Sequence, residues 1–261
     1  MPFSWLKEER RRWLLARPFP PEWLDYLHAN VALYAALAEG EKARLHDDLR
    51  VLVDEKNWEG CRGLVVTDEV KVTIAAQSAL LLLGLEHDYF GRVLSVLVYP
   101  SAFQIAREDT LRDGLVPEPA GPALGQAVYR GPVILAWDEV LDESRHPEKG
   151  RNVVLHEFAH QLDDLDGESN GVPLLADPEQ ERRWRGVMTA EYNKLRKDLE
   201  RGKNTLLDPY ASKNPAEFFA VATECFFTRP AHMRGRHPLL YEVLGDYYGQ
   251  DPAAREAAGR E

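Results

Sequence analysis

The sequence contains little cysteine, no excess of positive charge and no long apolar run. Two cysteines, Cys61 and Cys225, are too few for a disulfide framework or a cysteine-rich metal site, and they favour a reducing, cytoplasmic location. A net charge of −11 argues against direct nucleic-acid binding. The longest apolar stretch, residues 75–85, is interrupted by Gln77 and Ser78 and is shorter than the roughly 20 residues that a membrane span needs. The sequence therefore predicts a soluble protein without a membrane partner.

The chain of 261 residues fits one large domain with short appendages. The charged N-terminus lacks the apolar core of a signal peptide. Residues 1–19 run into a proline-rich stretch and are predicted to form an N-terminal extension. Residues 20–249 are the predicted domain, and the polar, alanine-rich residues 250–261 are predicted to fray.

Apolar residues recur at helical spacing through much of the chain. They predict helices over residues 22–37 and 41–58, with Gly40 ending the first of them. Asp68 is a suitable N-cap for a helix that runs to Leu83. Further helices are predicted over residues 151–165, 178–201, 215–228 and 238–248.

Only a few segments read as strands, namely residues 64–67, 93–98 and 128–137. The Gly131-Pro132 pair interrupts the last of them and makes it an edge strand or a bulge. Residues 113–126 are rich in glycine and proline and are predicted to form a loop. Helices, a few strands and then helices again predict an α+β fold, mostly helical with a small mixed sheet.

His156, Glu157 and His160 form the pattern HExxH inside a predicted helix. Residues four apart lie on one face of a helix, so the two imidazoles can reach one tetrahedral zinc ion. Glu157 lies beside them, able to hold a metal-bound water and take its proton. The opposite side of the helix is apolar, with Val154, Leu155, Phe158 and Leu162.

Two aspartates follow the histidines in the same helix. Asp163 comes seven residues after His156, two turns on, and is predicted to lie on the ligand face. There it could accept the second N–H of a ligand histidine and fix its tautomer. Asp164 is the neighbouring alternative for this role.

A catalytic zinc needs a third protein ligand. Asn214 as N-cap and Pro215 at the first helical position predict a helix start. Glu217 and Glu224 follow, seven residues apart and near the same face. Glu217 could instead cap its own helix, and Glu224 could hydrogen-bond a ligand or face solvent. The spacing favours Glu217 only slightly and leaves both open.

The segments HEFAHQLD at 156–163 and NPAEFFAV at 214–221 resemble the Mlc titration factor A (MtfA) peptidases. The same segments are similar to the protease domain of anthrax lethal factor. The resemblance to the MtfA family extends from about Pro20 to Tyr248. It includes VTDEV around Asp68, AAQSALLLLGL at 75–85, VYP at 98–100 and GPVILAW at 131–137.

The resemblance implies a gluzincin-like zincin fold, one zinc per chain, aminopeptidase-type activity and binding to the glucose repressor Mlc. It implies Glu217 as the third zinc ligand. Tyr210 stands seven residues before Glu217, where a tyrosine lines the lethal-factor site. Its phenol could donate to the oxyanion of a tetrahedral intermediate, or it could simply anchor the helix entry.

The sequence thus predicts peptide hydrolysis by metal-activated water, with Glu157 as general base. The alternative is a non-catalytic protein that sequesters a repressor and keeps a residual zinc site. Glu157 favours the enzyme, because a structural zinc needs no base and usually has four protein ligands. A peptide substrate could pair with an edge strand through main-chain hydrogen bonds. The predicted substrate strand comprises Val133, Ile134, Leu135, Ala136 and Trp137.

Overall fold

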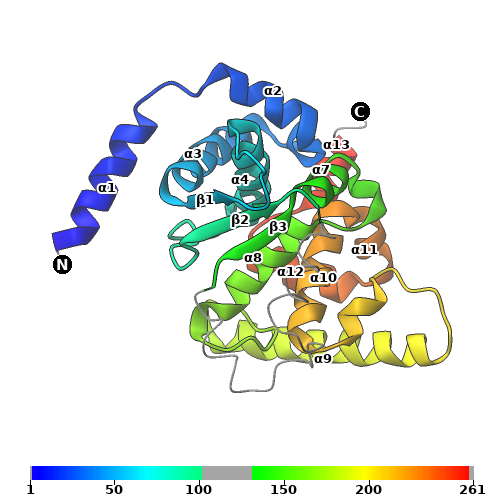
Figure 1. Cartoon of the computed structure of the whole chain (residues 1–261). Coiled ribbons are helices and arrows are strands. Elements are labelled where there is room, and N and C mark those ends of the chain that lie inside the picture. Colours follow the sequence, from blue (N-terminus) through cyan, green and yellow to red (C-terminus); the bar gives the residue numbers. More distant parts are fainter. Residues whose placement is uncertain (1, 102–130, 259–261) are drawn as a thin grey trace, which may run out of the picture.

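The computed structural model describes residues 2–101 and 131–258, which form many helices around a small sheet (Figure 1). The first helices are α1 (Pro2–Leu15), α2 (Pro21–Asn30), α3 (Glu39–Glu55) and α4 (Asp68–Leu82). Those after the sheet are α7 (Trp137–Arg145), α8 (Val153–Asp163), α9 (Pro178–Glu200), α10 (Pro215–Thr228), α11 (Pro230–Arg236), α12 (Pro238–Tyr248) and α13 (Pro252–Ala258). The 3₁₀ turns are η1 (Ala32–Ala36), η2 (Pro147–Lys149), η3 (Asp164–Asp166) and η4 (Pro209–Ser212).

The sheet consists of β1 (Asn57–Gly60), β2 (Ser95–Tyr99) and β3 (Val133–Ala136), in the order β1-β2-β3. Both pairs are parallel, so the expectation of a mixed sheet is wrong for the strands that the structure describes. Parallel neighbours need a crossover connection, and α4 lies in the connection from β1 to β2. The α+β character with a small sheet is confirmed.

Several element boundaries differ from the sequence-based prediction. Residues 64–67 are not a strand, because β1 at residues 57–60 takes the place beside β2. The predicted helix 22–37 is divided into α2 and η1. Gly40 lies inside α3 and does not end a helix, and Thr67 rather than Asp68 caps α4.

The segment around Trp137 also differs from expectation. β3 ends at Ala136, and Trp137 begins α7, whose first turn carries Asp138 and Glu139. Acidic side chains there interact favourably with the positive end of the helix dipole and so stabilise this helix start. The loop predicted at residues 113–126 lies outside the described residues.

Part of the C-terminal segment, which the sequence predicts to fray, forms the helix α13. Pro252 and Ala253 of α13 are buried, and the Ala253 backbone N–H donates to the Tyr241 hydroxyl at 2.9 Å. Gln250 donates to the backbone oxygen of Leu80 in α4 at 2.9 Å. Burial of apolar surface and these bonds hold the segment against the domain.

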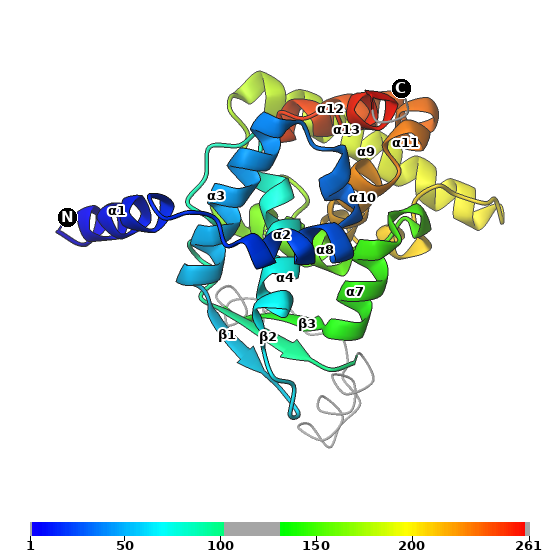
Figure 2. The same ribbon diagram turned by 90° about the horizontal axis from the view of Figure 1, so that it is seen from above.

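The site-bearing helix α8 lies at the centre of the molecule. It packs against α4 and α10 and also contacts β3, as Figures 1 and 2 show from two directions. Nearly every residue of α4 and α10 is buried, so both form rigid walls beside α8. By contrast, α1 projects away from the body (Figure 2). None of the described helices is long and apolar enough to cross a bilayer.

Candidate metal centre

The two motif histidines project from one side of α8. Asn152 caps this helix, since its Oδ1 accepts the Leu155 backbone N–H at 2.9 Å. As predicted, the opposite side of the helix is buried in the core. The side chains that bury this face are Val154, Leu155, Phe158 and Leu162.

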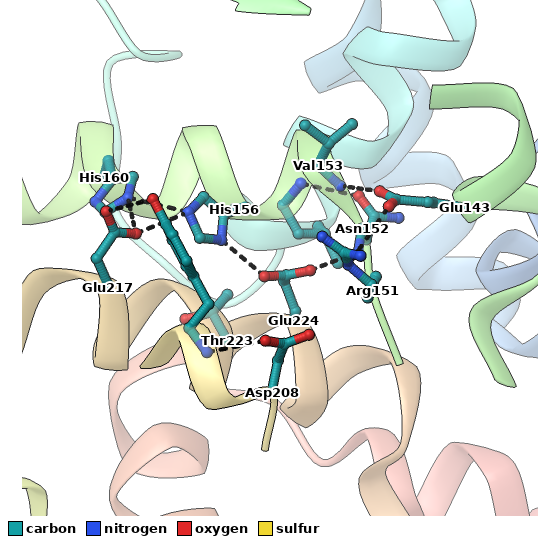
Figure 3. A network of polar contacts seen from close by, with 12 residues as sticks. Glu143, Arg151, Asn152, Val153, His156, His160, Asp208, Glu217, Thr223 and Glu224 are labelled. Carbon is teal, nitrogen blue, oxygen red and sulfur yellow. Dashed lines mark hydrogen bonds and ion pairs between the residues drawn. The ribbon is translucent and has the colours of Figure 1, made fainter. Parts of the chain in front are cut away.

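His156, His160 and Glu217 converge on one point (Figure 3). The two Nε2 atoms lie 3.2 Å apart, and Glu217 Oε2 lies 3.1 Å from His156 Nε2 and 3.3 Å from His160 Nε2. Ligand atoms about 2.0–2.1 Å from a tetrahedral zinc are separated by about 3.3 Å, which matches all three edges. Two imidazole nitrogens and one carboxylate oxygen are also a suitable donor set. The residues therefore fit a metal ion.

Glu217 comes from the first turn of α10. Asn214 Oδ1 accepts the Glu217 backbone N–H at 2.9 Å, so the predicted cap is present. Among the described residues, the Glu217 carboxylate bonds to other side chains and accepts no backbone N–H at the start of its own helix. This argues against a capping box. Burial would raise the pKa of Glu217, but its contacts with His156 and His160 outweigh that effect and lower it strongly.

Glu224 approaches His156 from the other side. His156 Nδ1 donates to Glu224 Oε1 at 2.7 Å, and the Asn152 backbone N–H donates to Glu224 Oε2 at 2.6 Å. Burial lowers the pKa of His156, but its contacts with Glu217 and Glu224 more than offset this and raise it to about 10. Glu224 thus holds the histidine through the nitrogen that faces away from Glu217.

A cavity of about 210 Å³ opens beside the histidines. Glu157, His156 and Tyr210 are among its lining residues, together with Glu139 and Glu143 of α7. Burial raises the pKa of Glu157, although the nearby His156 and His160 act in the opposite direction. A carboxylate of raised basicity therefore faces a space next to the candidate metal ligands.

Tyr210 reaches the site from η4, and its side chain is 48% exposed. Its hydroxyl donates to Glu217 Oε1 at 3.1 Å. Lys213, which no motif in the sequence marks, donates to the Tyr210 oxygen at 3.0 Å and lies 3.4 Å from Glu217 Oε1. The two oxygens of Glu217 therefore face different groups: Oε2 faces the histidines and Oε1 faces Tyr210 and Lys213.

The aspartates predicted to support the histidines bond elsewhere. Asp163 is fully buried, and its Oδ2 accepts the Gly171 backbone N–H at 2.8 Å, while its Oδ1 has no hydrogen-bond partner among the described residues. Burial raises the pKa of Asp163 to about 6. Asp164 accepts the hydroxyl of Ser169. The hydrogen bond to His156 that was expected from an aspartate is accepted by Glu224 instead.

The predicted substrate strand runs beside α8 without reaching the cavity. β3 contacts α8 and is an edge of the three described strands. Ile134 is 42% exposed, whereas Val133, Leu135 and Ala136 are buried. Trp137 belongs to α7. None of these residues lines the described cavity, so the substrate role of the strand stays a prediction.

Three buried or partly buried polar residues near the site were not singled out from the sequence. Glu143 accepts the Val153 backbone N–H at 2.6 Å, and Gln77 accepts from the Asn152 side chain at 2.6 Å. Of the three, only Asn152 carries a local signal, because it is a good N-cap placed directly before a helical pattern. Gln77 and Glu143 belong to other helices and form no motif with the histidines.

The HExxH helix, the converging ligand atoms and the adjoining cavity together form a candidate metal centre. The chain belongs to the glucose-regulated metallo-peptidase M90 family, whose model matches residues 5–249. An uncharacterized protein of Synechocystis sp. is 39% identical over 253 residues, which are 95% of this chain and 90% of that protein. Mlc titration factor A of Yersinia pestis and of Yersinia pseudotuberculosis are each 34% identical over 238 residues, 90% of this chain and 86% of theirs. The resemblance to the MtfA family is confirmed.

Proposed function

We propose that this protein is a zinc-dependent peptidase with a gluzincin-like zincin fold and one zinc per chain. His156, His160 and Glu217 would hold the ion. The observation that carries the proposal is the convergence of their three ligand atoms at 3.1–3.3 Å from one another. Membership in a metallopeptidase family supports the same conclusion.

Zinc, when bound, would supply Lewis-acid chemistry that polarises the scissile carbonyl and makes water acidic. Glu157 faces the cavity and takes the proton of the attacking water, then delivers it to the leaving amine. Because burial raises its pKa, Glu157 is a better proton acceptor than an exposed carboxylate. Its position next to His156 in α8 keeps it beside the reacting groups.

Tyr210 is proposed to stabilise the oxyanion that forms on the substrate. Its hydroxyl donates to Glu217 Oε1 at 3.1 Å, so the phenol lies at the edge of the ligand cluster. A small turn of this half-exposed side chain would aim the donor at a substrate oxygen. Hydrogen bonds to a developing oxyanion are among the strongest contributions to catalysis.

The substrate is proposed to be a peptide, cleaved as by an aminopeptidase, in the cytoplasm. Main-chain pairing with β3 would hold an extended peptide alongside α8 without selecting its sequence. The exposed side chain of Ile134 faces outward from this strand.

Metal dependence is the test of this proposal. We expect about one zinc per chain by elemental analysis, with the metal lost in His156→Ala and in His160→Ala. Chelation should abolish hydrolysis of a panel of amino-acid p-nitroanilides and short peptides, and added zinc should restore it. Full zinc content in both histidine variants would refute the proposed ligand set.

A second candidate function is sequestration of a repressor of the Mlc type. The relatives named Mlc titration factor A favour it. This function requires a binding surface and no hydrolysis, so a Glu157→Gln variant should bind a purified Mlc-type repressor as tightly as the wild type does. Absence of binding by both proteins in a sedimentation assay would exclude this candidate for the repressor tested.

A further inference from the structure

A chain of buried polar side chains connects the interior of α4 with the candidate metal ligand His156. Gln77 of α4 and Asn152 at the start of α8 are 1% and 2% exposed. Gln77 Oε1 accepts from Asn152 Nδ2 at 2.6 Å, and Gln77 Nε2 donates to the backbone oxygen of Thr73 at 3.0 Å. Both ends of the Gln77 amide are therefore occupied.

Asn152 can satisfy its partners in one orientation only. Its Nδ2 donates to Gln77, and its Oδ1 accepts the Leu155 backbone N–H at 2.9 Å. A flipped amide would place a donor against the Leu155 N–H and an acceptor against the Gln77 oxygen. Because both groups are buried, such a mismatch would be costly. Gln77 therefore fixes the amide that caps α8.

The next link fixes the carboxylate of Glu224, which is 6% exposed. The Asn152 backbone N–H donates to Glu224 Oε2 at 2.6 Å, so Oε1 is left to accept from His156 Nδ1 at 2.7 Å (Figure 3). An ionised carboxylate only accepts hydrogen bonds, so the contact with Glu224 requires a proton on Nδ1. Nε2 is then the ring nitrogen left to bind a metal ion beside Glu217 and His160.

We infer that Gln77 is a positioning residue for the metal centre: through Asn152 and Glu224 it holds His156 in the tautomer and direction that metal binding requires. The inference rests on the proposed zinc site. The competing role of Gln77 is purely structural, as a buried hydrogen bond that joins α4 to α8. The two roles differ in what they predict for metal affinity.

The test is Gln77→Met, which keeps a side chain of similar length and removes the acceptor of Asn152. We expect its zinc affinity, measured by chelator competition, to fall about 10-fold, at the lower end of the effect of groups that orient metal ligands.

Gln250→Met is a matched control. Gln250 is also buried and also donates to a backbone oxygen of α4, that of Leu80, but its Oε1 accepts from Arg255 and leads away from His156. We expect this variant to lose thermal stability and keep wild-type zinc affinity. Gln77→Glu should recover most of the affinity, because a buried protonated carboxyl can reproduce both bonds of the amide.

Wild-type zinc affinity in folded Gln77→Met would overturn the inference. If that variant does not fold, Asn152→Ser replaces it, because serine still caps α8 but has no amide for Gln77. The same loss of affinity is then expected, and wild-type affinity would again overturn the inference. A wild-type protein that binds no zinc would instead refute the proposed function.

Discussion

The two glutamates of α10 contact the same histidine through different nitrogens. Glu217 Oε2 lies 3.1 Å from His156 Nε2, whereas Glu224 Oε1 accepts from Nδ1. Loss of a ligand should lower zinc affinity by orders of magnitude, and loss of the group that orients it by about 10–100-fold. We therefore expect chelator competition to rank zinc binding as Glu217→Ala weakest, Glu224→Ala intermediate and wild type tightest. Weaker binding by Glu224→Ala would show that the two assignments must be exchanged.

The phenol of Tyr210 gives a second prediction at the scale of single residues. Tyr210→Phe keeps the ring and removes only the hydroxyl that donates to Glu217. If this hydroxyl stabilises the oxyanion, kcat should fall by about 100-fold while KM and zinc content stay near wild-type values. Lys213→Met, which removes a neighbouring donor to Glu217 Oε1, is the control, with a much smaller effect expected. An unchanged kcat in Tyr210→Phe would assign the tyrosine to anchoring the helix entry.

The sequence predicted those site residues that are linked by local spacing. His156, Glu157 and His160 share one helix, so the period of the helix alone places them together. Glu217 and Glu224 lie far along the chain, and only the packing of α10 against α8 decides which nitrogen each one meets. Asp163 and Asp164 were predicted as supports from helix position, but the burial of Asp163 and its bond to Gly171 direct it elsewhere.

At the scale of elements, the two terminal helices are attached in different ways. The contacts of α1 are mainly ionic: Lys7, Arg10 and Arg11 pair with acidic groups of the body. Trp5 and Trp13 stay exposed. Except for the part-buried Arg11–Glu55 pair, these ion pairs lie at the surface, where they are weak and screened by salt. Deletion of residues 1–16 should therefore change the melting temperature by only a few degrees. Limited proteolysis should cleave the linker at residues 16–20 faster in roughly 1 M salt, because ion pairs at the surface are almost fully screened there. Equal cleavage rates at low and high salt would contradict this prediction.

The C-terminal helix α13 should behave in the opposite way. Its loss would remove buried Ala253 and the bond from Gln250 to α4. Truncation after Gly249 should therefore lower the free energy of unfolding by about 2 kcal/mol or more. Urea denaturation, with the deletion of residues 1–16 as the matched comparison, measures the difference. Equal stability of the two truncated proteins would contradict the claim that α13 is held more strongly than α1.

Elements with strong local signals were predicted well. α9 and α10 begin at prolines preceded by capping residues, Asp177 and Asn214, and both carry a long helical period. β1 was missed because its four residues are mostly exposed and show no alternation; pairing with β2 makes them a strand. Residues 64–67 have the composition of a strand but pair with no strand in the part of the chain that the structure describes. Partners in a sheet are a tertiary property that composition does not determine.

In the whole molecule, α8 is held in place by hydrogen bonds from the elements that surround its first turn. α4 supplies Gln77, α7 supplies Glu143 and α10 supplies Glu224, and each bonds directly to the cap of α8 or its first backbone groups. Three elements distant in sequence therefore fix the start of one helix, one turn away from the first histidine. We propose residues 20–249 as the catalytic domain, with α13 packed onto it.

We propose that the molecule hydrolyses peptide bonds with a metal and Glu157. The most direct measurement compares peptide hydrolysis by the wild type and by Glu157→Gln at equal zinc content, with both proteins purified identically to remove trace proteases. Glu157→Gln removes the base but none of the proposed ligands. We expect full zinc occupancy and a loss of nearly all hydrolysis in the variant. Equal turnover by the two proteins would contradict it.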